Sequence, residues 1–143
     1  RPIMAQMIQF GLKYRSRTPC TGKMDQSIRS YREAAAYMSQ TRIMPNVALT
    51  GSCERMHVKG RVVEAGLSAC LLLEPKGSPA EDWFEPGVDY LQYDSMNEAK
   101  SIVERLKETP DETEVFGMRL RVKVMQYHCP EKFWQPILQR CGL

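Results

Sequence analysis

Residues 70–73, Cys-Leu-Leu-Leu, form a continuous apolar run directly behind a segment with the pattern of a short helix, residues 60–69. A short run of this kind is typical of a strand that is buried on both faces, as in a parallel sheet covered by helices. A basic, glycine-containing turn, Lys59-Gly60-Arg61, precedes the helix. This order of turn, helix and buried strand favours an α/β fold.

The rest of the chain alternates between strand and helix patterns. We expect strands at 3–10, 42–49, 70–73 and 90–93, and helices at 25–40, 60–69 and 95–108. Ser95 begins a capping box, and Pro110 and Pro130 are typical of the first positions of two further helices. Residues 80–84 are expected to form one helical turn. The alternation predicts a Rossmann-like, doubly wound parallel sheet with extra C-terminal helices.

The bulk composition is that of an ordinary globular domain. The chain has 143 residues, of which 43% are hydrophobic and 26% are charged, enough for one domain with a full core. No apolar run approaches the roughly 20 residues that a membrane span needs, and no signal peptide is visible. Because the chain begins with Arg1 rather than methionine, we expect residues 1–143 to be a single domain from a larger two-domain protein.

The cysteines favour a reducing, cytoplasmic location. There are five of them, an odd number, and no two form a C-x-x-C pair. Cysteine–histidine pairs at 53 and 57 and at 128 and 129 match the spacing of no common zinc module. We therefore expect no bound metal.

Charge is distributed unevenly along the chain. The first 32 residues hold seven lysines and arginines against one acid, whereas residues 74–114 hold twelve acids against four bases. A basic stretch is compatible with a nucleic-acid surface or a phosphate-facing cleft, but a solvated face is the commoner outcome. The basic stretch lacks regular aromatic residues, which counts against a platform for stacked bases.

The turn that enters the helix at 60–69 is the candidate binding site. Backbone N–H groups at a helix N-terminus attract phosphate, and Lys59 and Arg61 add full positive charges at that end. Gly60 would allow the backbone to approach a phosphate closely. Glu64, one turn further on, could accept hydrogen bonds from the paired hydroxyls of a sugar. Because ligands bind at the carboxyl ends of the strands in such sheets, where the loop 50–60 lies, topology and chemistry predict the same place.

Each of these four residues also has a plain structural interpretation. Glu64 could be an exposed acid favoured by the helix dipole, and we prefer the ligand role for it. Arg61 and Lys59 could be solvated surface charges, and Gly60 could serve only a turn with positive φ.

Other polar and aromatic residues are expected to be structural. Glu74 follows the strand 70–73, and we expect a loop carboxylate there rather than a ligand. Trp83, Phe133 and Trp134 are most simply residues of the core or of a contact between domains.

The run Lys59-Gly60-Arg61-Val62-Val63-Glu64-Ala65, with the apolar strand that follows it, carries a family resemblance. Further along come Phe84-Glu85-Pro86-Gly87 and the capped helix from Ser95. In this order and spacing, the motifs resemble the C-terminal half of GT-B glycosyltransferases. The likeness is greatest to the glycosyltransferase family 1-like group that includes the spore-maturation CgeB-type proteins, and it covers about residues 28–138.

This resemblance implies a donor-binding domain that takes part in moving a sugar from a nucleotide-sugar to an unknown acceptor. In the family, the glutamate that matches Glu64 contacts the donor ribose, and basic residues near the turn contact the diphosphate. The chain departs from the retaining enzymes at Met56, where they often have a second glutamate eight residues before the first. Glu54 is close to that position but out of register.

Two other functions remain open on the residues alone. One is a non-catalytic nucleotide-binding module of the same fold, which the Met56 departure favours. The other is a nucleic-acid-binding domain that uses the basic first 32 residues. No catalytic base is identified, so we expect this domain alone to bind a donor without turning it over.

Overall fold

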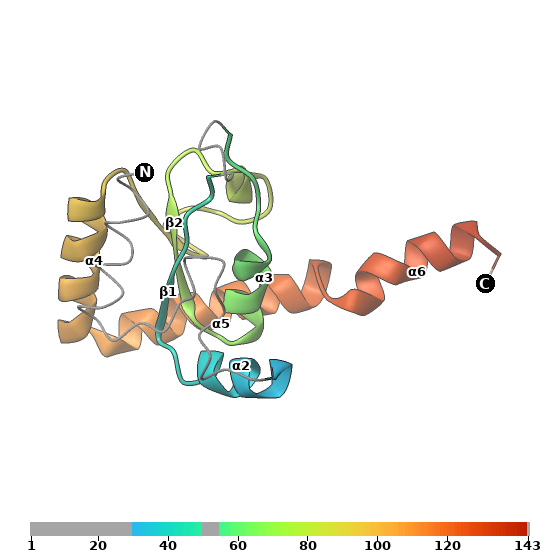
Figure 1. The fold of residues 1–143 in the computed structure, drawn as a ribbon, viewed down its shortest axis with the longest axis horizontal. Helices are drawn as coiled ribbons and strands as arrows, with labels where there is room; N and C mark the ends of the chain where they lie inside the picture. The colour runs from blue at the N-terminus through green and yellow to red at the C-terminus, as the bar shows by residue number, and fades with distance from the viewer. Residues whose placement is uncertain (1–29, 50–54, 143) are drawn as a thin grey trace.

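The computed structural model describes residues 30–49 and 55–142 (Figure 1). Its three strands, β1 (Ile43–Pro45), β2 (Leu71–Pro75) and β3 (Leu91–Tyr93), form one parallel sheet in the order β1-β2-β3. The α/β class with a parallel sheet is therefore confirmed. The strands at 42–49, 70–73 and 90–93 occur with shifted ends, and the strand expected at 3–10 lies outside the described residues.

Helices connect and follow the strands as the sequence predicts. They are α2 (Tyr31–Met38), α3 (Gly60–Leu67), the 3-10 turn η1 (Pro79–Asp82), α4 (Met96–Glu108), α5 (Pro110–Tyr127) and α6 (Pro130–Arg140). Ser30 and Ser95 cap α2 and α4 by accepting the backbone N–H three residues ahead. In the part of the chain that the structure describes, no helix is long and apolar enough to cross a membrane.

The central strand β2 builds a core on each face of the sheet. Leu72 faces a cluster that includes Val62 of α3 and Leu120 of α5. Leu71 and Leu73 face the opposite cluster, in which α4 supplies most of the partners. All three leucines are fully buried. A run of consecutive apolar residues thus marks a strand with helices on both sides, and the doubly wound arrangement is confirmed.

Helix α5 closes the end of the sheet where β2 begins. A methyl group added at Gly117 would lie 2.1 Å from the carbonyl oxygen of Ala69, the residue between α3 and β2. Ala69 itself has a positive φ of 53°. Gly66 of α3 is similarly tight, because an added methyl would lie 2.5 Å from a Val124 methyl. Gly66 therefore serves the packing of α3 on α5.

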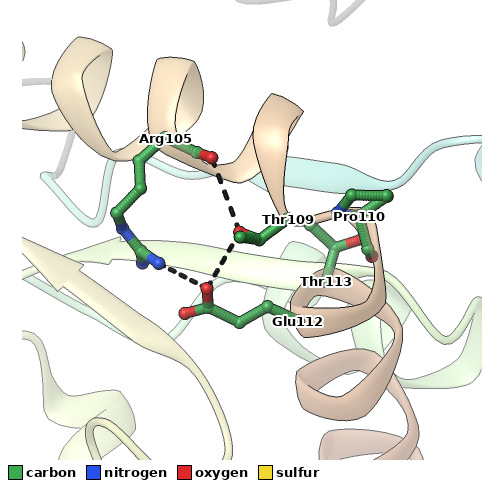
Figure 2. Close-up of polar contacts among 5 residues, drawn as sticks. All are labelled: Arg105, Thr109, Pro110, Glu112 and Thr113. Carbon is green, nitrogen blue, oxygen red and sulfur yellow. Dashed lines mark hydrogen bonds and ion pairs between the residues drawn. The ribbon is translucent and has the colours of Figure 1, made fainter.

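A polar cluster fixes the junction between α4 and α5 (Figure 2). The guanidinium of Arg105 donates to the carboxylate of Glu112, and the Thr109 hydroxyl donates to the same carboxylate over 3.1 Å. The hydrogen bond from Arg105, helped by the weaker one from Thr109, holds the pKa of Glu112 below its ordinary value. Because the groups are largely solvated, the cluster orients the start of α5 more than it stabilises the fold.

The thiol of Cys70 is a first test of this core. It is fully buried and donates to the carbonyl oxygen of Thr41 over 2.8 Å, and burial raises its pKa to about 11. Cys141 is exposed. Because only the thiolate reacts, we expect iodoacetamide at pH 8 to modify native Cys70 at least ~100-fold more slowly than Cys141. Peptide mass spectrometry over time measures both rates, and equal rates would contradict the packing.

Candidate functional site

A buried carboxylate joins the ends of the first two strands at the carboxyl edge of the sheet. Glu74 has no exposed surface. Its Oε2 accepts from Asn46 Nδ2 over 2.8 Å, and its Oε1 accepts from Ser78 Oγ over 2.7 Å. The expectation of a loop carboxylate is wrong, because β2 extends to residue 75 and its alternation turns Glu74 inward. Burial raises the pKa of Glu74, and the charge of Lys59 partly opposes this.

The same cluster reaches the third strand. The Tyr93 hydroxyl donates to the backbone carbonyl of Asn46 over 2.6 Å, and burial raises the pKa of Tyr93. Asn46, Glu74, Ser78 and Tyr93 thus tie together the ends of β1, β2 and β3. Sequence reasoning missed Asn46 and Ser78, although Asn46 directly follows β1 and Ser78 lies three residues after β2, at the edge where ligands bind in such sheets.

The four predicted site residues begin α3 at this edge. Lys59 is the N-cap residue in extended conformation, without a side-chain cap. Arg61 Nε lies 3.7 Å from Glu64 Oε2, and both side chains are partly exposed. A methyl group added at Gly60 would lie 3.8 Å from Glu64 Oε1, so this carboxylate folds back over the first turn. The structure therefore brings Gly60, Arg61 and Glu64 together, with Lys59 as the residue that precedes them at the N-cap.

The electrostatics of this turn favour an anion. Glu64 balances one of the two cations, because it pairs with Arg61, while Lys59 acts on the buried Glu74. The first-turn N–H groups add the partial positive charge of a helix N-terminus. The Arg61–Glu64 pair is solvated and weak, so a ligand can replace it at little cost.

Several alternative interpretations concern other parts of the chain. Within residues 30–49 and 55–142, no group of three or more metal-ligating side chains is close enough to hold a metal ion. Cys53, Glu54 and most of the basic first 32 residues lie outside the described residues. Met56 forms an antiparallel bridge with Leu49 and is 37% exposed.

Trp83, Phe133 and Trp134 are exposed, so the core alternative is wrong and the contact between domains stays a prediction. Trp83 is 44% exposed and stacks on His128, with ring centroids 4.6 Å apart. Phe133 and Trp134 lie on α6, which extends away from the sheet (Figure 1) and has no buried residue. None of the three belongs to the core of the described domain, because the strands and α3–α5 already enclose it.

A sequence-family comparison places these features in context. Residues 8–139 match the family of glycosyl transferase-like proteins. The chain belongs to this family. No curated protein and no solved structure matches the chain significantly.

The match extends over nearly the whole of this glycosyltransferase-like domain. It includes the turn that enters α3, the buried strand β2 and the segment after η1. That segment is anchored to the domain by Asp89, which accepts from the backbone N–H of Glu85 over 2.7 Å and from Lys123 Nζ over 2.5 Å. The Phe-Glu-Pro-Gly motif is thereby held against α5. The resemblance to glycosyltransferases is confirmed at the level of the family, and the CgeB-type subgroup stays a prediction.

Proposed function

We propose that this glycosyltransferase-like domain binds the donor of a glycosyl transfer reaction, a nucleotide-sugar, at the N-terminus of α3. The observation that carries the proposal is the convergence of Gly60, Arg61 and Glu64 on one helical turn, at the carboxyl edge of a parallel sheet. Family membership supplies the reaction class. The location agrees with the rule that open α/β sheets bind ligands at this edge.

In this proposal, the turn holds the diphosphate. The first N–H groups of α3 donate to phosphate oxygens, and Lys59 and Arg61 neutralise their charge. Negative charge grows on the diphosphate as the sugar leaves, so cations fixed at this point stabilise the transition state. The proposal uses no metal ion.

Glu64 binds the ribose in this proposal. Its carboxylate has two oxygens, and the pair with Arg61 occupies Oε2 at 3.7 Å. When a diphosphate takes Arg61, both oxygens become available to accept hydrogen bonds from the 2′ and 3′ hydroxyls. The weak pair thus keeps the two side chains on the same turn until the donor arrives.

The buried cluster supports this site indirectly. Glu74 accepts a hydrogen bond from Asn46 at the end of β1, and the charge of Lys59 partly opposes the rise in the pKa of Glu74. We propose that Glu74 is a positioning residue, which keeps the carboxyl edge rigid around the α3 turn without touching the donor.

Titration calorimetry with a double-mutant cycle tests the role of Glu64. The ligands are UDP or GDP, whichever binds more tightly, and its 2′,3′-dideoxy analogue. We expect Glu64→Gln to weaken binding of the ribonucleotide about 10- to 100-fold, as for loss of hydrogen bonds to a charged group. The variant should bind the dideoxy analogue as the wild type does. Glu108→Gln, on the exposed end of α4, is the matched control and should bind like the wild type.

Equal weakening for both ligands would refute a contact between Glu64 and the ribose. Binding of neither nucleotide, together with tight, salt-sensitive binding of DNA or RNA, would instead support the nucleic-acid function.

The exposed Met56 favours a second candidate, a nucleotide-binding module without catalytic activity. Both candidates predict donor binding, and they differ in chemistry. Because this domain alone is expected to bind a donor without turning it over, the assay uses it joined to an acceptor-binding domain. Release of nucleotide from a bound nucleotide-sugar there, measured by chromatography and abolished by Glu64→Gln, would favour the transferase.

A further inference from the structure

Helix α5 has an apolar stripe on the side away from its own core. The core side contains Phe116, Leu120 and Val124. At 100° per residue, four further apolar residues lie roughly opposite that side. They are Val115, Met118, Val122 and Met125, and each is between 48% and 59% exposed. A helix that is apolar on two opposite sides is normally buried on both.

The spacing of this stripe is that of a two-stranded coiled coil. Its steps are three, four and three residues, so Val115 and Val122 occupy the a positions of a heptad and Met118 and Met125 the d positions. β-Branched residues at a with unbranched or γ-branched residues at d favour two parallel helices. Methionine at d is a flexible apolar substitute for leucine.

The charges beside the stripe are complementary to a second copy. In this register Glu114 is a g residue and Arg119 is the following e residue, five positions later. Parallel pairing places Glu114 of each helix beside Arg119 of the other, twice per dimer. Neither side chain has a partner within the described part of the chain, whereas Glu112 is already bound to Arg105 and Arg121 to the carbonyl of Leu67.

Antiparallel pairing of the same stripe is unfavourable. Matching Val115 with Met125 of the second copy would bring Arg119 beside Arg119 and Arg121 beside Arg121 across the interface. Like charges at e and g positions oppose association. The charge pattern therefore selects both the occupant and its direction.

We propose that this glycosyltransferase-like domain forms a parallel homodimer through the α5 stripe. The contact lies on the helix that packs against Ala69, at the end of the sheet where β2 begins. It is therefore separate from the proposed donor site at the carboxyl edge. A failed test of one proposal leaves the other unaffected. Two heptads bury a small area, so association should be reversible and visible only at high protein concentration.

Sedimentation velocity of the full chain over a concentration series up to about 1 mM tests the dimer. The wild type should show a monomer–dimer equilibrium, and Val122→Glu should abolish it. Val122 is exposed, so this variant should melt at the wild-type temperature. Phe133→Glu, on the exposed face of α6, should leave the association unchanged. A monomeric wild type, as expected if another domain covers the stripe, or a dimer lost only with Phe133→Glu, would overturn the proposal.

Charge reversal tests the orientation. Glu114→Arg and Arg119→Glu should each weaken the dimer about tenfold, because two attractive pairs become repulsive. The double variant that carries both changes should restore the wild-type dissociation constant. Failure of the double variant to recover would exclude the parallel register.

Discussion

Gly117→Ala should destabilise the domain by about 2–4 kcal/mol, although alanine is the better helix former. The added methyl would lie 2.1 Å from the Ala69 carbonyl oxygen and 2.7 Å from its carbon, and both are backbone atoms that cannot rotate away. Helix α5 would have to move off the α3–β2 connection. This shift would also separate Leu120 and Val124 from Leu72, so contacts far from the glycine would weaken.

Urea unfolding followed by circular dichroism measures this change. Gln126→Ala is the matched control, because Gln126 is exposed on the same helix and its replacement should change the unfolding free energy by less than about 0.5 kcal/mol. A Gly117→Ala protein as stable as the control would mean that α5 does not pack closely on Ala69.

Removing the buried carboxylate at the sheet edge should have a similarly large effect. Glu74→Ala leaves the Asn46 amide and the Ser78 hydroxyl without their acceptor, and it opens a cavity between β1 and β2. An unsatisfied buried polar group costs about 1–3 kcal/mol, and relief from burying a charge offsets part of the loss. We expect a net destabilisation of about 2–4 kcal/mol in urea unfolding. Glu74→Gln keeps the shape and one acceptor, and should be much milder.

The pH dependence of the unfolding free energy distinguishes the effect of the charge of Glu74 from the effect of its shape. Burial raises the pKa of Glu74 above its ordinary value of 4.5, so the folded state favours the protonated carboxyl. The stability that this preference contributes is fully present below pH 4.5 and is lost as the pH rises through the raised value. Relative to Glu74→Gln, the wild type should therefore lose stability as the pH rises above 4.5. A constant difference between the two proteins over this rise in pH would contradict a raised pKa.

The local patterns of the sequence predicted the helices and strands well. The apolar run at 70–73 identified the doubly covered strand because consecutive residues of a strand face opposite sides of the sheet. Ser95, Pro110 and Pro130 located helix starts, since capping and the fixed φ of proline act within one turn. Strand ends were less certain: Glu74 belongs to β2, because pairing with β3 rather than local sequence decides where a strand stops.

Part of the candidate site could be predicted from local sequence patterns in the same way. Gly60, Arg61 and Glu64 are neighbours on one helical turn, so their proximity follows from spacing alone. Asn46 and Glu74 are 28 residues apart in the chain, and only the parallel pairing of β1 with β2 brings them to one hydrogen bond.

By itself, the sequence determined the α/β class, the helix starts and the turn that carries two cations and an acid, because these features depend on contacts within a few residues. Tertiary structure alone decided that Glu74 is buried, that Trp83 and Phe133 are exposed, and that α5 keeps one apolar side uncovered. Burial depends on which surfaces the fold brings together. Burial of apolar surface stabilises the fold by about 25 cal/mol per Å² only where another part of the fold removes that surface from water. The residue type alone does not show which part of the fold this is.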